Sequence, residues 1–212
     1  MMAWLQGVTL HSDRVTLAPL ATSHVDALIE AASDGELWNL WYTHVPRPQD
    51  MAAEIARRRQ LQDDGEMLPF AVIDNAIGNA IGNAIGNAID KPVGMTTFMN
   101  VDAPNRRVEI GGTWYRRGVQ RTGLNTHAKH LLLTHAFESL DCIAVELRTH
   151  FFNHQSRRAI ERLGAKLDGI LRNHQIAGNG TLRDTCVYSI VAAEWPTVKA
   201  HLAWQIARPR GR

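Results

Sequence analysis

The sequence has too little of several features to belong to the protein classes that they define. Only two of the 212 residues are cysteines, Cys142 and Cys186, which is too few for a disulfide framework and gives no metal-ligand spacing. No apolar run reaches the roughly 18 residues of a membrane-spanning helix, and the ten histidines include no HExxH pair. The start lacks the basic flank and apolar stretch of a signal peptide. We therefore expect a soluble cytoplasmic protein with no metal site and no membrane contact.

An excess of charge of one sign is also absent. The net charge is +2, which is too small to indicate a nucleic-acid-binding protein. The arginines instead form short local clusters, each compatible with an ordinary solvated face. These clusters lie at residues 57–59, 106–107, 116–121 and 157–158. Neither a GxxxxGK[ST] phosphate loop nor a GxGxxG motif is present, so these two nucleotide-binding signatures do not describe the chain.

Apolar periodicity and helix start and stop signals predict an α+β protein made of one domain, residues 1–212. Helices are expected over residues 24–32, 34–46, 48–64, 126–140, 153–164 and 194–206. Strands are expected over residues 14–20, 68–74, 91–100, 106–115, 142–151, 166–175 and 181–193. The order implies a mostly antiparallel sheet with one strand–helix–strand crossover through residues 113–151.

A short perfect repeat, NAIGNAIGNAIGNAID, fills residues 75–90 between two expected strands that would otherwise form a hairpin. Its glycines each cost a helix about 1 kcal/mol relative to alanine, although the isoleucines recur at helical spacing. The sequence favours a low-complexity insertion in the hairpin with no chemistry of its own. A role in self-association or in covering a substrate stays open.

The turn QRTGLNTHA at residues 120–128 leads directly into an expected helix. A helix start carries unpaired N–H groups and about half a positive charge. Gly123 lets the backbone approach a ligand closely, and successive N–H groups from Arg121 to Thr126 can form a nest for an anion such as a pyrophosphate. Taken alone, a glycine- and threonine-containing turn before a helix is more often structural than phosphate-binding.

Two segments in this order resemble the GNAT acetyltransferase superfamily. The residues QRTGLN (120–125) are similar to its Q/R-x-x-G-x-G/A signature, and NHQSRRAIERLGA (153–165) is similar to its N-x-x-S-x-x-x-x-x-x-x-G marker. The resemblance extends over residues 10–193, in particular to the branch that contains the ribosomal-protein alanine and serine N-terminal acetyltransferases. It implies a GNAT-like mixed, mostly antiparallel sheet with splayed central strands and flanking helices.

The resemblance also implies the reaction and the ligands. Acetyl-CoA would be the acetyl donor, without a metal, and the acceptor would be an amine of a small molecule or of a protein N-terminus. The alternative is a non-catalytic acyl-CoA-binding or regulatory domain of the same fold. Dimers are common in this family, so a homodimer is one arrangement that the resemblance allows.

Cofactor and acceptor residues follow from the matched motifs. The implied cofactor-binding residues are Thr113, Trp114, Tyr115, Arg121, Thr122, Gly123, Leu124, Asn125, Thr126 and Asn153. The implied wall of the acceptor pocket contains Trp38, Trp41 and Tyr42, for which packing onto the core is the competing interpretation.

The chemistry needs a base because amines are mostly protonated at pH 7. Glu109 is the first candidate, since strand alternation would place it on the same face as Thr113. His150 is the second candidate, because histidine titrates in the useful range. Many family members use a tyrosine as the acid seven residues after the marker asparagine, where this chain has Ile160. Ser156 and Tyr115 are the remaining candidate acids.

Overall fold

The structure is a computed structural model that describes residues 4–76 and 91–208. Its strands form one eight-stranded sheet in the order β1-β2-β3-β4-β5-β6-β8-β7. The strands are β1 Leu10–His11, β2 Val15–Pro19, β3 Leu68–Asp74, β4 Pro92–Asp102, β5 Arg107–Tyr115, β6 Ala144–His150, β7 Lys166–Ile176 and β8 Leu182–Val191. Every neighbouring pair is antiparallel except β5 and β6, which are parallel and joined through a helix. The predicted sheet and its single crossover are therefore confirmed.

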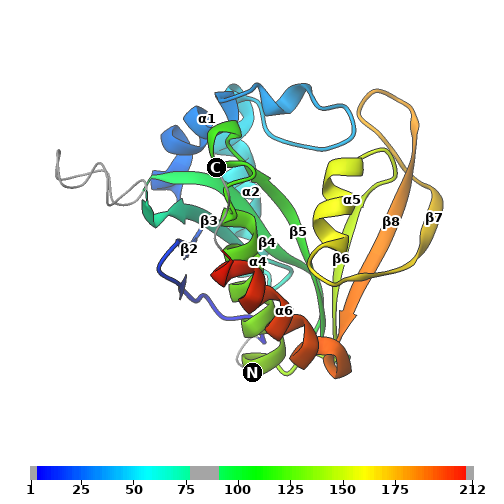
Figure 1. Ribbon diagram of the computed structural model, residues 1–212. Helices are drawn as coiled ribbons and strands as arrows, with labels where there is room; N and C mark the ends of the chain where they lie inside the picture. The colour runs from blue at the N-terminus through cyan, green and yellow to red at the C-terminus, as the bar shows by residue number, and fades with distance from the viewer. Residues whose placement is uncertain (1–3, 77–90, 209–212) are drawn as a thin grey trace.

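Helices cover both faces of the sheet. They are α1 Val25–Ser33, α2 Met51–Asp63, α4 Leu124–Thr134, α5 His154–Glu161 and α6 Trp195–Ala207. Short 3-10 turns stand at residues 22–24, 37–39, 48–50, 117–119 and 192–194, and a π-helical segment, His135–Ser139, continues α4. Figure 1 shows α4 and α6 lying side by side, while α5 lies along β6 and β8 at the other end of the sheet.

Each face of the sheet has its own cluster of buried residues. The larger one joins Val108 and Ile110 of β5 to Leu124 and Leu132 of α4, together with residues of α5 and α6. The smaller one joins Met95 of β4 and Trp114 of β5 to residues of α1 and α2. We call these the α4 face and the α1–α2 face. Both cysteines are buried in the larger cluster.

The central strands β5 and β6 stay together for only part of their length. The parallel register covers Arg107 with Ala144, Val108 with Val145 and Glu109 with Glu146, and no pair follows. Beyond this point the two strands diverge, as the green and yellow-green ribbons do in Figure 1. The splayed centre implied by the resemblance is thus present, and it begins at a pair of glutamates.

A β-bulge in β5 changes which residues share a face. The register with β4 shifts between Met95 and Thr97, and Gly112 has a φ of 57°, a left-handed conformation that favours glycine. The extra residue turns Trp114 to the α1–α2 face and Thr113 to the α4 face. The expectation that Glu109 and Thr113 share a face is therefore wrong, because simple alternation assumes an unbroken strand.

Several boundaries differ from those expected from the sequence. The segment 34–46 has only the 3-10 turn Leu37–Asn39 in place of a helix. The helix expected from residue 126 begins at Leu124, while Asn153 caps α5 as expected by accepting a hydrogen bond from the Ser156 N–H. The repeat at 75–90 lies outside the described residues apart from its first two. Within residues 4–76 and 91–208, no helix is both long and apolar enough to cross a membrane.

Candidate active site

The α4 N-terminus presents backbone N–H groups at the open end of β5. Gly123 is the N-cap with a φ of 96°, and Arg121 also has a positive φ of 64°. The N–H groups from Arg121 to Asn125 have no acceptor in the described part of the chain, whereas those of Thr126 and His127 bond to the Gly123 carbonyl. Donors without acceptors beside a helix N-terminus suit an anionic group. The left-handed positions of this turn are thus Arg121 and Gly123, while Asn125 lies in the first turn of α4.

Two side chains hold this turn against β5. The Tyr115 hydroxyl donates to Asn125 Oδ1 at 3.1 Å, and Gln120 Nε2 donates to the Tyr115 carbonyl at 2.9 Å. Burial raises the pKa of the Tyr115 phenol well above its usual range. The phenolic proton is therefore engaged and hard to release, and the geometry favours Tyr115 as a support of the turn.

Thr113 lies in a buried polar contact on the α4 face. Lys129 Nζ of α4 donates to Thr113 Oγ1 at 2.7 Å and to Thr96 Oγ1 at 3.2 Å, and the two hydroxyls lie 2.8 Å apart. Lys129 is 4% exposed, and burial lowers the pKa of its ammonium to about 7. These hydrogen bonds connect the bulge of β5 to α4.

α5 lies across the diverging strands from this turn, and its C-cap Arg162 donates a hydrogen bond to Thr126 Oγ1 of α4. Asn153 Oδ1 is occupied by the Ser156 N–H, a bond of 3.0 Å. The Ser156 hydroxyl has no hydrogen-bond partner among the described residues and is partly exposed. Ile160, at the position where many relatives carry a tyrosine, is 6% exposed within the larger cluster. Of the two, only Ser156 presents a group that can exchange a proton.

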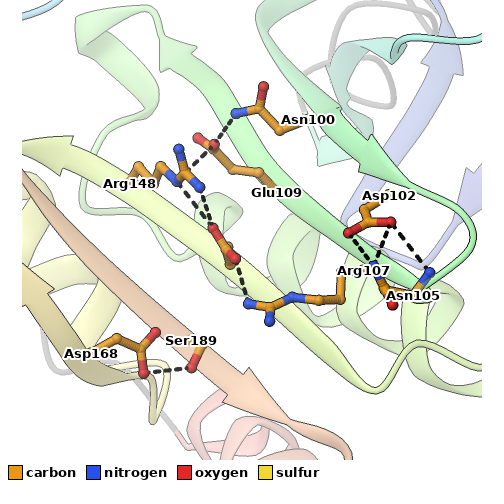
Figure 2. Close-up of polar contacts among 9 residues, drawn as sticks. Asn100, Asp102, Asn105, Arg107, Glu109, Arg148, Asp168 and Ser189 are labelled. Carbon is orange, nitrogen blue, oxygen red and sulfur yellow. Dashed lines mark hydrogen bonds and ion pairs between the residues drawn. The ribbon is translucent and has the colours of Figure 1, made fainter. Parts of the chain in front are cut away.

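The opposite face carries Glu109 in a polar network (Figure 2). Its Oε2 accepts a hydrogen bond from Asn100 Nδ2 at 2.6 Å and lies 3.5 Å from Arg148 Nε. Arg148 also binds Glu146, which in turn accepts a bond from Arg107. Glu109 is 6% exposed, and burial raises the pKa of its carboxyl, with Asn100 and Arg148 opposing that rise. A carboxyl with a raised pKa is better matched to accepting a proton near neutral pH.

A missing side chain makes room for this carboxylate. A Cβ built on Gly111 would lie 2.7 Å from Glu109 Oε1 and 2.5 Å from Met99 Sδ. Both distances are shorter than real contacts to a Cβ. The glycine at 111 therefore allows Glu109 to fold back over its own strand.

A groove on the same face leads toward Glu109. It has a volume of about 550 Å³, and its lining includes Asn100, Arg107, Glu146 and Arg148. A second hollow, lined by Asp168 and Ser189 among others, shares the last three of these residues. Glu109 itself lies beneath the groove and is reached through Asn100 and Arg148, an arrangement that suits transfer of a proton through water.

Aromatic rings stand at the far end of β6. The rings of Trp41 and His150 are edge-on with centroids 5.0 Å apart, and Phe152 lies 5.8 Å from His150. Tyr42 contacts Trp41 at 5.7 Å. Trp38 packs against the smaller core cluster instead, so the structure brings only two of the three expected acceptor residues to this end of the sheet.

Sequence reasoning did not single out four residues that the site contains. Asn100 and Arg148 contact Glu109, Lys129 binds Thr113, and Phe152 contacts His150. Only Lys129 left a usable signal, as a lysine within the apolar stripe of a helix. The other three are polar or aromatic residues at strand ends, which the sequence does not distinguish from surface residues. In the described part of the chain, no group of three or more histidine, cysteine or acidic side chains could hold a metal ion.

Comparison with known proteins gives the same class. A family model described as the acetyltransferase (GNAT) domain matches residues 14–166. The chain therefore belongs to the GNAT acetyltransferase family, and the N-acetyltransferase class expected from the sequence is confirmed at the level of the family.

Individual relatives are consistent with this family. A Bacillus subtilis (strain 168) protein with the provisional name ribosomal N-acetyltransferase YdaF is 34% identical over 102 residues, or 48% of this chain. The match spans 55% of that relative's length. The structure of a GCN5-related N-acetyltransferase from Brucella melitensis is 28% identical, with a TM-score of 0.77 over 94% of this chain and 86% of that chain.

Two further structures are less than 25% identical and show likeness of fold alone. Mycobacterium smegmatis RimJ, in complex with CoA-disulfide, is 20% identical, with a TM-score of 0.77 over 95% of this chain and 96% of that chain. The microcin C7 self-immunity acetyltransferase MccE, in complex with acetyl-CoA and AMP, is also 20% identical, with a TM-score of 0.70 over 85% of this chain and 93% of that chain.

Proposed function

We propose that the protein transfers the acetyl group of acetyl-CoA to a primary amine by direct attack of the amine. The observation that carries the proposal is the divergence of β5 and β6 directly after Glu109 and Glu146. It leaves an opening with anion-binding N–H groups on one side and a buried, polar-contacted carboxylate on the other. An acyl transfer between two ligands needs both to reach one point, and holding them there accounts for several kcal/mol of the barrier.

The α4 side has the groups that a CoA diphosphate needs. The N–H groups from Arg121 to Asn125 lack acceptors, and the helix behind them adds partial positive charge. Thr113, Trp114 and Tyr115 would border the pantetheine arm along the free edge of β5, and the Asn153 side chain would face it from α5. When bound there, acetyl-CoA supplies an activated acetyl group as a thioester.

The α1–α2 side has the groups that an amine needs. An ammonium ion must lose a proton before it attacks, and Glu109 would take that proton directly or through a water in the groove. Trp41 and Tyr42 would border the acceptor at the end of β6. The relative named as a ribosomal N-acetyltransferase supports a protein N-terminus as one kind of acceptor, beside small amines.

Two further groups would complete the reaction. A strand N–H released from the β4 ladder by the bulge at Gly112 would polarise the thioester carbonyl. The free hydroxyl of Ser156 would protonate the departing thiolate, a role for which Tyr115 is poorly suited because its proton is held by Asn125. The non-catalytic alternative gives no chemical role to the buried carboxyl of Glu109.

Thermal unfolding with and without acetyl-CoA tests the donor side. A ligand at 100 times its dissociation constant stabilises a protein by about 2.7 kcal/mol, or roughly 5–10 °C in Tm for a chain of this size. We expect this shift in wild type and its loss in Gly123→Glu, because the new carboxylate would occupy and repel the diphosphate. Gly123→Ala is the matched control, since it strains the same left-handed residue without adding charge.

Release of the CoA thiol when amines are offered tests the transfer itself. Stabilisation by acetyl-CoA without any amine-dependent thiol release would contradict the enzyme and favour the acyl-CoA-binding alternative. Equal Tm shifts in wild type and Gly123→Glu would contradict the assignment of the turn.

A further inference from the structure

Hydrogen-bond donors of two side chains on the α1–α2 face have no acceptor in the described part of the chain. They are the two terminal nitrogens of the Arg183 guanidinium on β8 and the Nε2 ring nitrogen of His150 on β6. His150 pairs with Thr185 in the register of the two strands, so Arg183 stands one step further toward the open end. Neither residue lies in the two segments, 120–125 and 153–165, that carry the family resemblance.

Arg183 differs from the other arginines of this face. Arg107 and Arg148 each form an ion pair with Glu146, whereas no carboxylate lies within 4.0 Å of Arg183 among residues 4–76 and 91–208. Its Nε donates to Thr185 Oγ1 at 3.1 Å, and its two terminal nitrogens have no partner there. The neighbouring Asp184 is engaged by Arg172 and by the Asn173 N–H. A half-buried guanidinium without a counter-ion is costly unless a ligand supplies one.

The tautomer of His150 follows from its backbone contact. The Phe152 N–H donates to His150 Nδ1 at 3.1 Å, so Nδ1 is an acceptor and a neutral ring carries its proton on Nε2. His150 is 2% exposed, and burial together with the nearby Arg183 lowers the pKa of its imidazole, which keeps the ring neutral. The Nε2 atom is buried without a hydrogen-bond partner. In this form His150 is a donor and not a base.

The half-exposed ring of Trp41 packs against the imidazole ring of His150. Its centroid is 5.0 Å from that of His150 in an edge-on geometry, which permits only a weak contact between an N–H and a ring face. Trp41 lies in the segment between the turn Leu37–Asn39 and α2 that has neither helix nor strand.

We propose that Arg183 and His150 bind a carboxylate of the acceptor while Glu109 receives the proton of its amine. The inference rests on the proposed acetyl transfer and gives its acceptor a chemical class: an amine with a carboxylate a few bonds away. Arg183 and Glu109 are near enough for each charge to act on the other, which matches the two opposite charges of such a molecule. The carboxylate belongs either to a free amino acid or to an acidic side chain next to a peptide N-terminus.

Paired acceptors test the proposal in the 212-residue protein. Alanine against alaninamide examines the free carboxylate, and the peptide amide Ala-Asp against Ala-Asn examines the acidic side chain. In at least one pair we expect wild type to favour the acid by at least about tenfold in kcat/KM. Arg183→Gln should abolish this preference, Arg183→Lys should restore part of it, and His150→Phe should reduce it by less than about tenfold. Arg172→Gln replaces a largely exposed arginine that is paired with Asp184, and this matched control should retain the preference.

The following results would contradict the carboxylate site. Wild type that treats acid and amide alike in both pairs, or Arg183→Gln that loses activity on both members equally, would overturn the proposal. If acetyl-CoA stabilises the protein but no amine causes release of thiol, the proposed transfer is wrong. The carboxylate site is then tested by binding measurements alone. In that case N-acetylalanine should raise Tm in the presence of CoA more than its amide does, in wild type but not in Arg183→Gln. Equal shifts would overturn the carboxylate site independently of turnover.

Discussion

Glu109 and Lys129 are buried charged residues on opposite faces of β5, and they are held in different ways. Glu109 contacts an amide and a guanidinium that both line a groove, while Lys129 hydrogen-bonds to two threonine hydroxyls behind the bulge. Burial shifts both pKa values toward neutrality, upward for Glu109 and downward to about 7 for Lys129. A shifted pKa alone therefore does not identify the reacting group. The reacting group must also be reached by a second reactant, and we propose that Glu109 is reached through the groove that Asn100 and Arg148 line.

The largest expected effect is that of Glu109→Gln on turnover. Removing a general base typically costs about 10²- to 10⁴-fold in rate, while the Tm shift with acetyl-CoA should remain, because the site proposed for that ligand lies on the other face. The raised pKa of Glu109 also predicts that wild-type kcat/KM falls as pH drops through a value above the usual glutamate range. Kinetics across pH measure both.

Glu146→Gln is the matched control for this substitution. Glu146 is the register partner of Glu109 and shares its arginine, yet its pairing with Arg107 and Arg148 leaves it a structural role. A loss of turnover as large as that of Glu109→Gln would show that the network acts as a unit, and unchanged turnover in Glu109→Gln would remove Glu109 as the base.

Stability should change in the reverse sense. A carboxyl whose pKa is raised by folding binds protons more readily in the folded state, so wild type loses stability as pH rises from the ordinary glutamate pKa to the raised one. Glu109→Gln should therefore be more stable than wild type at pH 7, and this difference should disappear in acid. Denaturant unfolding at several pH values measures it.

A smaller effect is expected from Gly111→Ala. The new methyl group would displace Glu109 Oε1 or Met99 Sδ, so we expect turnover to fall by about 10- to 100-fold with a stability loss of about 1–3 kcal/mol. Gly169→Ala on β7 is the control, because a Cβ there meets nothing within 4 Å. Equal behaviour of the two variants would show that the space beside Glu109 has no role.

The smallest effect on turnover is expected from Lys129→Met. A lysine whose pKa is lowered by folding makes wild type less stable below about pH 7, and the deficit shrinks by up to about 1.4 kcal/mol per pH unit between about 7 and 10. The methionine variant should thus be more stable at neutral pH, and its advantage should decline in alkali. A turnover loss comparable with that of Glu109→Gln would break the comparison between the two faces.

Most of the architecture could be predicted from local patterns, and the details of the site could not. The strands, the crossover and the Asn153 cap follow from periodicity and capping residues, and the turn at Gly123 follows from a short motif. The bulge at Gly112 and the groove depend on the register between strands, which no local pattern fixes. For the same reason Asn100 and Arg148 could not be placed beside Glu109, since each comes from a different strand.

The burial of both cysteines has a practical consequence for the bench. Cys142 lies at 2% exposure with a thiol pKa raised to about 12, and Cys186 is fully covered. Thiol-reactive dyes should therefore not react with the folded enzyme and should detect only the CoA that it releases. The same dyes should detect two thiols per chain once the protein unfolds, so a single reagent can follow both catalysis and denaturation.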